Sequence, residues 1–212
     1  MNENFKIESY QLLLQKSGEY LENIGFDYDQ YHQYQLKQQL LLTIAYCAKI
    51  EIFELRGFDN QDIYPALDLI KIIGQNLNYL SIESLNDISN ISSIVLRNLG
   101  QILPLKLEYL NLYLAIKAND FKVFLKKSQD TYIKKLQIRQ IGKQDDILPY
   151  IKKYIMKKER VKYLAFREGD FMEKRDLFFL KDEVNEFKLH NIIVKNYEDL
   201  YINCYKYIKE IY

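Results

Sequence analysis

The sequence predicts an α/β fold in which short parallel strands alternate with helices along one continuous solenoid. Three observations support this prediction. A hexapeptide with apolar residues at its first, fourth and sixth positions recurs along the chain, and its copies start 23 to 30 residues apart. The segments between the copies carry apolar residues at helical spacing.

The copies of the hexapeptide define seven predicted strands. They are Leu21-Ile24-Phe26, Ile50-Phe53-Leu55, Leu77-Leu80-Ile82, Leu107-Leu110-Leu112, Ile133-Leu136-Ile138, Val161-Leu164-Phe166 and Val184-Phe187-Leu189. A period in the twenties with this pattern is typical of a leucine-rich-repeat solenoid, here of about seven repeats. Since such strands run in the same direction, we expect a curved parallel sheet with its apolar positions facing inward.

The connectors are predicted to be helices on the convex side of that sheet. Their apolar residues recur at helical spacing, as at Leu36, Leu40, Ile44 and Cys47, at Ile63, Leu67, Ile70 and Ile73, at Ile91, Val95, Leu99 and Ile102, at Phe121, Phe124 and Leu125, and at Ile147, Ile151, Tyr154 and Ile155. Short polar residues that favour helix starts precede three of them, namely Asn60 and Asp62, Asn119 and Asp120, and Asp145 and Asp146.

The two ends of the chain are predicted to cover the open ends of the solenoid. Residues 1–19 form an N-terminal cap helix in this prediction, and residues 195–212 form a C-terminal capping helix. The whole of 1–212 is then a single leucine-rich-repeat domain.

Composition excludes several classes of protein. Apolar residues make up 48% of the chain, which excludes wholesale disorder, and 30 basic residues balance 29 acidic ones. Cys47 and Cys204 are too far apart in the sequence to indicate a disulfide framework or a metal site. With no secretory signal and no apolar run of about 20 residues, we expect a soluble protein of the cytoplasm, with the nucleus as an alternative, and no membrane partner.

The residues of common catalytic sites are scattered. His32 and His190 are the only histidines, and the seven glycines form no phosphate-binding loop. Cys204 and His190 could approach each other in the last repeat, but nothing else supports a nucleophile with its base. Asp145 and Asp146 are interpreted as helix caps. We therefore expect no enzyme, no catalytic residue, no cofactor and no metal.

The register of the strands predicts which side chains line the concave face. The full set is Ile52, Glu54, Arg56, Tyr79, Ser81, Glu83, Tyr109, Asn111, Tyr113, Lys135, Gln137, Arg139, Tyr163, Ala165, Arg167, Glu186, Lys188 and His190. Tyrosine and arginine are enriched in binding hot spots, so this face is the candidate site for a protein partner. Its candidate residues are Tyr79, Glu83, Tyr109, Asn111, Tyr113, Gln137, Arg139, Tyr163 and Arg167. The alternative is that they are repeat-consensus residues that stack on one another.

Two further expectations follow from the pattern. A charge at Leu110 or Leu136 should disrupt a central repeat, whereas the same change at Asn111 or Gln137 should cost little, because those polar positions face outward. Residues 117–167 hold fifteen Lys and Arg against five Asp and Glu, a patch that could attract an acidic protein or nucleic acid. Because most of these lysines fall on the predicted helices, we favour a solvated face instead.

Two phrases of the sequence carry a family resemblance. They are ILPLKLEYLNLYLAIKANDFKVFLKKSQDTYIKKL, at 102–136, and DDILPYIKKYIMKKERVKYLAF, at 145–166. They resemble intracellular leucine-rich-repeat proteins of the F-box and ribonuclease-inhibitor-like kind, and an expanded fungal family among them. The resemblance implies a solenoid that binds another protein. It also implies an alternative, substrate recognition in a cullin-type ubiquitin ligase, through a longer parent or a separate F-box protein.

The chain departs from that family in two ways. No F-box precedes the first repeat, so a ligase adaptor is not carried over as a partner. The Asn or Cys expected after each strand is replaced, at Phe58, Leu85, Ala115, Ile141, Gly169 and Ile192. The usual side-chain ladder of hydrogen bonds to the backbone cannot form there, so we expect less regular turns.

Overall fold

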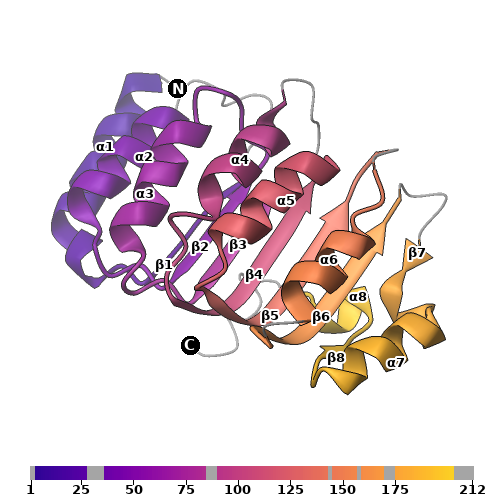
Figure 1. Cartoon of the computed structure of the whole chain (residues 1–212). Helices are drawn as coiled ribbons and strands as arrows, with labels where there is room; N and C mark the ends of the chain where they lie inside the picture. The colour runs from indigo at the N-terminus through magenta and orange to yellow at the C-terminus, as the bar shows by residue number, and fades with distance from the viewer. Residues whose placement is uncertain are drawn as a thin grey trace.

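A mainly parallel β-sheet with helices on one face organises the molecule (Figure 1). The computed structural model describes residues 3–27, 36–84, 90–142, 145–156, 159–169 and 175–202. Within these residues the strands are β1 (Asn23–Asp27), β2 (Ile52–Arg56), β3 (Tyr79–Glu83), β4 (Lys106–Leu114), β5 (Tyr132–Gln140), β6 (Val161–Glu168), β7 (Arg175–Asp176) and β8 (Ile193–Val194). Strands β1 to β6 are parallel and adjacent in chain order, which confirms the predicted α/β class.

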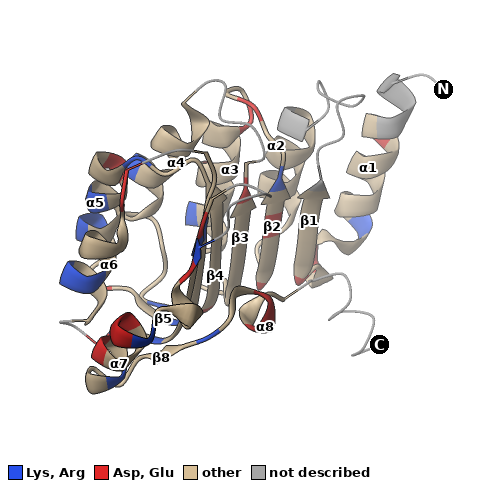
Figure 2. Cartoon of the chain, turned by 90° about the vertical axis from the view of Figure 1, so that its right-hand side faces the viewer, with Lys and Arg blue, Asp and Glu red and all other residues tan. Residues whose placement is uncertain are grey.

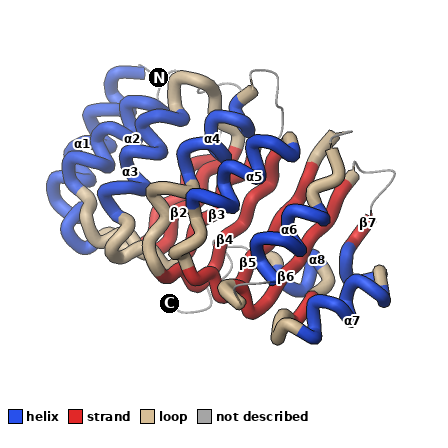
Figure 3. The backbone as a smooth tube through the Cα atoms, in the orientation of Figure 1, coloured by secondary structure: helices blue, strands red, loops and turns tan. Residues whose placement is uncertain are grey.

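The helices form a layer over one face of this sheet (Figure 3). This layer contains α1 (Glu3–Ser17), α2 (Leu36–Tyr46), α3 (Ile63–Ile73), α4 (Ile91–Leu99), α5 (Ala118–Lys127) and α6 (Leu148–Ile155). Helix α7 (Lys181–Leu189) and the short α8 (Tyr197–Leu200) follow in the chain, and α8 packs against the other face of the sheet. Each of α2 to α6 lies between two consecutive parallel strands, as a crossover between such strands requires. We call the opposite face of the sheet, which α1 to α6 leave uncovered, the helix-free face.

The apolar positions of the hexapeptide align across the sheet as predicted. Leu80 is paired with Leu110, Leu110 with Leu136, and Leu136 with Leu164 in successive ladders. All four side chains are at most 1% exposed. They belong to one continuous apolar core between the sheet and the helices.

The helix starts agree with the prediction in part. The Asp146 carboxylate accepts a hydrogen bond from the N–H of Leu148 at 3.0 Å and so satisfies the first free donor of α6, although the N-cap position itself is Ile147. Asp145 instead accepts from the N–H of Ala118, which ties α6 to the preceding helix α5. The prediction that Asn119 and Asp120 precede α5 is wrong, because the helix begins at Ala118 and both lie in its first turn.

Other polar groups fill the role of the missing Asn or Cys ladder. The Ser92 hydroxyl accepts from the N–H of Ala115 at 3.0 Å. The Gln140 amide donates to the carbonyl oxygens of Ile116 and Asp145, at 3.0 and 2.8 Å. Buried backbone groups in these turns are therefore satisfied by side chains that differ from one repeat to the next.

The seventh predicted strand is wrong. Val184, Phe187 and Leu189 lie in helix α7, so Glu186 and Lys188 are helical and His190 follows directly after. The spacing from Val184 to Phe187 is three residues, which also fits one helical turn. Phe187 is fully buried, but Leu189 is 84% exposed, which shows that only part of the pattern faces the core.

For the described residues, the prediction of a C-terminal capping helix over 195–212 is also wrong. Only Tyr197–Leu200 is helical, and the chain is extended at Tyr201. Residues 195–202, which we call the C-terminal strap, lie against the helix-free face and do not close the end of the helix layer (Figure 2). The rest of the predicted helix, 203–212, lies outside the described residues. At the other end, α1 packs beside α2, and the Tyr10 hydroxyl bonds to that of Thr43 at 2.8 Å.

Candidate functional site

The helix-free face presents three rows of side chains that run across the strands. The row near the amino ends is Ile52, Tyr79, Tyr109, Lys135 and Tyr163, the middle row is Glu54, Ser81, Asn111, Gln137 and Ala165, and the row near the carboxyl ends is Arg56, Glu83, Tyr113, Arg139 and Arg167. All nine predicted site residues fall in these rows. The sequence therefore predicted which side chains line this face, but it did not predict that the C-terminal strap covers part of it.

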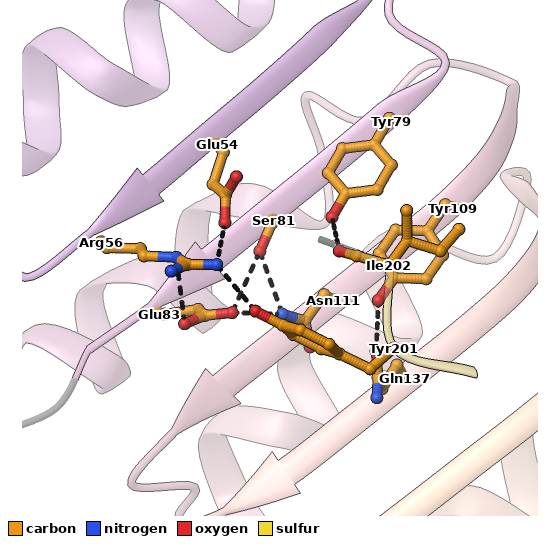
Figure 4. A network of polar contacts seen from close by, with 10 residues as sticks. All are labelled: Glu54, Arg56, Tyr79, Ser81, Glu83, Tyr109, Asn111, Gln137, Tyr201 and Ile202. Atoms are coloured by element: carbon orange, nitrogen blue, oxygen red, sulfur yellow. Dashed lines mark hydrogen bonds and ion pairs between the residues drawn. The ribbon is translucent and has the colours of Figure 1, made fainter. Parts of the chain in front are cut away.

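The C-terminal strap crosses this face from β6 toward β2. The carbonyl oxygen of Tyr197 accepts a hydrogen bond from the Gln137 amide at 2.7 Å. The strap continues to Ile202, whose carbonyl oxygen accepts from the Tyr79 hydroxyl at 2.9 Å (Figure 4). The Tyr201 hydroxyl lies 2.7 Å from a guanidinium nitrogen of Arg56. The chain thus already binds one extended segment on the predicted partner surface.

The middle row is buried in spite of its polarity. Asn111 and Gln137 are 0% exposed, so the predicted exposure of both side chains is wrong. The Asn111 amide donates to the Ser81 hydroxyl at 3.0 Å and to Glu83 at 2.8 Å. Because buried amides with such partners are costly to replace, a charge at either position should not be tolerated.

Opposite charges meet where β2 and β3 end. The Arg56 guanidinium lies 2.5 Å from the Glu54 carboxylate and 3.4 Å from that of Glu83 (Figure 4). Although burial opposes its charge, the carboxylates of Glu83 and Glu54 raise the pKa of Arg56 above its ordinary value. Burial raises the pKa of Glu83 in spite of Arg56. The Tyr201 hydroxyl of the strap docks onto this cluster.

A second cluster ties the strap to β6 and β7. The Arg167 side chain is 9% exposed and lies 3.3 Å from Asp176 and 2.5 Å from Glu198. Its guanidinium also lies over the Tyr197 ring, 4.6 Å from the centroid. Asp176 in turn accepts from the N–H of Tyr197 at 3.1 Å. One arginine therefore recognises both an aromatic ring and a carboxylate of the strap.

The amino-end row forms a pocket next to the strap. The rings of Tyr79 and Tyr109 are stacked, with centroids 4.5 Å apart, and the Tyr109 hydroxyl donates to the Gln137 amide oxygen. A pocket of about 390 Å³ opens over these rings. It is lined by Glu51, Ile52, Asn78, Tyr79, Glu108, Tyr109, Lys135 and Ile202. The last described residue of the strap forms one wall of it.

Part of the face remains accessible. Tyr113 and Arg139 are half-buried, and the Arg139 guanidinium lies 4.4 Å from the centroid of the Tyr113 ring. Tyr163 is half-buried too. These three predicted site residues differ from Tyr79, Glu83, Tyr109, Asn111, Gln137 and Arg167, which are all buried. Tyr113 and Arg139 therefore keep part of their surface exposed beside the strap.

The lysines of the central basic segment that belong to helices α5 and α6 lie on the helix side of the molecule (Figure 2), whereas Lys135 of β5 lies in the amino-end row of the helix-free face. The Lys152 ammonium lies 2.6 Å from Glu186 of α7, and it also pairs with Glu183. The Lys127 ammonium donates to the carbonyl oxygen of Arg97 at 2.7 Å. These contacts agree with the interpretation of a solvated helix face.

Metal ligands, catalytic residue types and membrane helices can be sought only in the described residues. Among the described residues, no group of three or more His, Cys, Asp and Glu side chains could hold a metal ion. His190 is half-buried at the end of α7, whereas His32 and Cys204 lie outside the described residues. Cys47 is buried, and burial raises the pKa of its thiol. In the same described ranges, no helix has the length and apolar character needed to cross a membrane.

Buried tyrosines at the site make stability sensitive to alkaline pH. Burial raises the pKa of Tyr109 and Tyr197 above the ordinary value of 10.0. Above pH 10 the unfolded chain therefore releases protons that the folded chain keeps, so stability falls as pH rises. Each such group lowers the free energy of unfolding by up to about 1.4 kcal/mol per pH unit.

Replacing Tyr109 by phenylalanine should make that decline shallower by about one tyrosine's share. Urea unfolding of the wild type and of Tyr109→Phe between pH 9 and about 11 measures it. The exposed Tyr64 provides the control, because Tyr64→Phe should leave the slope unchanged. Equal slopes for all three proteins would refute the burial of Tyr109.

Comparisons of the chain with protein-family models, with curated proteins and with solved structures give no match.

Proposed function

We infer that the chain is a leucine-rich-repeat solenoid that binds another protein on the helix-free face of its sheet. One observation carries this proposal. The face already binds a peptide segment, the C-terminal strap, through side chains of Arg56, Tyr79, Gln137 and Arg167 that come from four different strands. A surface that holds one segment by such contacts has the chemistry needed to hold another.

The composition of the face supports the same proposal. Tyrosine and arginine bury large areas and still form hydrogen bonds. Tyrosine recurs in the row at the amino ends, and arginine recurs in the row at the carboxyl ends. The accessible pair Tyr113 and Arg139 belongs to this surface. In a solenoid, repeated rows of this kind build an extended binding surface that one repeat alone cannot provide.

A capture experiment with matched variants tests the proposal. Full-length protein carrying Tyr113→Ala and Arg139→Ala is compared with the wild type on an extract of the native cell. The control carries Tyr64→Ala and Lys126→Ala, two exposed positions on helices α3 and α5. The proposal expects proteins that the wild type and the control capture and that the face variant loses. Identical captured sets for all three would refute it.

A further inference from the structure

The strap covers the face in the manner of a bound peptide. Most of the apolar core lies on the other side of the sheet, whereas the strap contributes small apolar contacts, chiefly Tyr197 and Leu200 against Ala165. Polar side chains supply the remaining contacts. Tyr201 and Ile202, at the far end of the strap, are only half-buried. Such an interface combines a few apolar anchors with a polar surround, as protein–peptide interfaces do.

Each strap position that contacts the face is recognised by its own chemistry. Tyr197 offers a ring to Arg167, and Glu198 offers a carboxylate to the same guanidinium at 2.5 Å. Leu200 is an apolar anchor, 6% exposed. Tyr201 offers a hydroxyl to Arg56 at 2.7 Å, and Ile202 packs beside the stacked tyrosines. Asp199, between them, is exposed.

We propose that the strap is an intramolecular stand-in for the partner, and that the partner presents a segment of the same chemistry. That segment consists, in this order, of an aromatic residue, an acidic residue, any residue, an aliphatic residue, a tyrosine and an aliphatic residue. The inference rests on the proposed function and gives it a ligand. The strap then competes with the partner for Arg56, Gln137 and Arg167.

The pocket beside Ile202 gives a longer ligand further contacts. A ligand that continues past this position meets Glu51, Glu108 and Lys135 at the rim and the rings of Tyr79 and Tyr109 below. Charged groups of both signs at the rim allow polar contacts that the described part of the strap does not make.

The strap has an advantage over a free ligand because it is attached to the same chain as the face. A tethered segment acts at an effective concentration of about 1 mM, so a free peptide with the same contacts binds the wild type poorly. Weakening only the strap removes this competition and leaves the face unchanged. Glu198→Gln together with Tyr201→Phe removes one ion pair and one hydrogen bond while keeping the shape of both side chains.

Fluorescence anisotropy with a labelled peptide tests the inference on the full-length protein. The probe has the sequence of residues 195–202, Lys-Asn-Tyr-Glu-Asp-Leu-Tyr-Ile. We expect it to bind the Glu198→Gln, Tyr201→Phe variant at least about tenfold more tightly than the wild type. Asp199→Asn is the matched control in the strap and should bind the probe as the wild type does. A probe with lysine in place of its glutamate should lose at least about tenfold in affinity for the double variant.

Three outcomes would overturn the inference. The first is that the probe does not bind the double variant at about 1 mM. The second is that the probe binds the wild type and the double variant with equal affinity. The third is that the double variant is a dimer on gel filtration, which would mean that two copies exchange straps. Circular dichroism checks that the variants are folded, and the single variant Glu198→Gln, whose side chain is 68% exposed in the wild type, serves if the double variant is not. No peptide binding together with capture that depends on Tyr113 and Arg139 would refute only this inference and leave the proposed function standing.

Discussion

Replacing Leu110 by aspartate is expected to unfold the protein at room temperature. Leu110 is fully buried in the central strand β4, between Leu80 and Leu136 of the neighbouring strands. The substitution loses about 1.5–3 kcal/mol of apolar burial and adds a carboxylate with no partner in the core, so the total exceeds about 5 kcal/mol. This is comparable to the whole free energy of unfolding of many domains, about 5–15 kcal/mol.

Leu105 provides the matched control for this change. It lies directly before the same strand and is 76% exposed, so Leu105→Asp should shift the free energy of unfolding by no more than about 0.5 kcal/mol. Circular dichroism during urea unfolding measures both variants. If Leu110→Asp unfolded at the same urea concentration as Leu105→Asp, the register of the apolar ladder would be wrong.

Replacing Arg167 by leucine is expected to cost about 3–5 kcal/mol. The substitution keeps an apolar stem but leaves the carboxylate of Asp176, 4% exposed, without its ion-pair partner. It also removes the stacking on Tyr197 and the ion pair with Glu198, so the strap should loosen at the same time. The same chemical change at Arg175 of strand β7 should cost less than about 1 kcal/mol, because that side chain is 51% exposed in its pair with Glu168.

A second substitution separates the two effects of Arg167. Asp176→Asn in the Arg167→Leu protein removes the unpaired charge and should recover part of the lost stability. Urea unfolding of the four proteins, wild type, Arg167→Leu, Arg175→Leu and the double variant, gives the comparison. A cost for Arg167→Leu no larger than that for Arg175→Leu would show that this buried cluster does not hold the strap.

The hexapeptide repeat predicted the sheet because its physics is local and repeated. Side chains alternate between the two faces along a strand, and each crossover places the next copy of the hexapeptide in the same register beside the previous one. Leu80, Leu110, Leu136 and Leu164 are therefore aligned across the sheet. The pattern failed at Val184, where a spacing of three also fits a helix. Asp182 and Glu183 in the first turn of α7 and Lys188 in its last turn match the helix dipole, and this signal could have identified the helix.

The covering of the site could not be predicted from local pattern. A polar residue such as Asn111 has the same place in a strand whether water or another segment covers it, and only the strap decides between the two. The strap itself has Tyr197, Leu200 and Tyr201 at helical spacing, yet its helix ends after one turn. Its course depends on Gln137 and Arg56, which lie far from it in the sequence.

The path of the strap across the helix-free face underlies both the proposed function and the proposed ligand. Site-specific photocrosslinking from p-benzoylphenylalanine placed at position 201, followed by mass spectrometry of the monomer, tests it most directly. We expect crosslinks within one molecule to strand β2 or β3, where Arg56 and Glu83 lie. Crosslinks confined to α7, or formed only between two molecules, would contradict it.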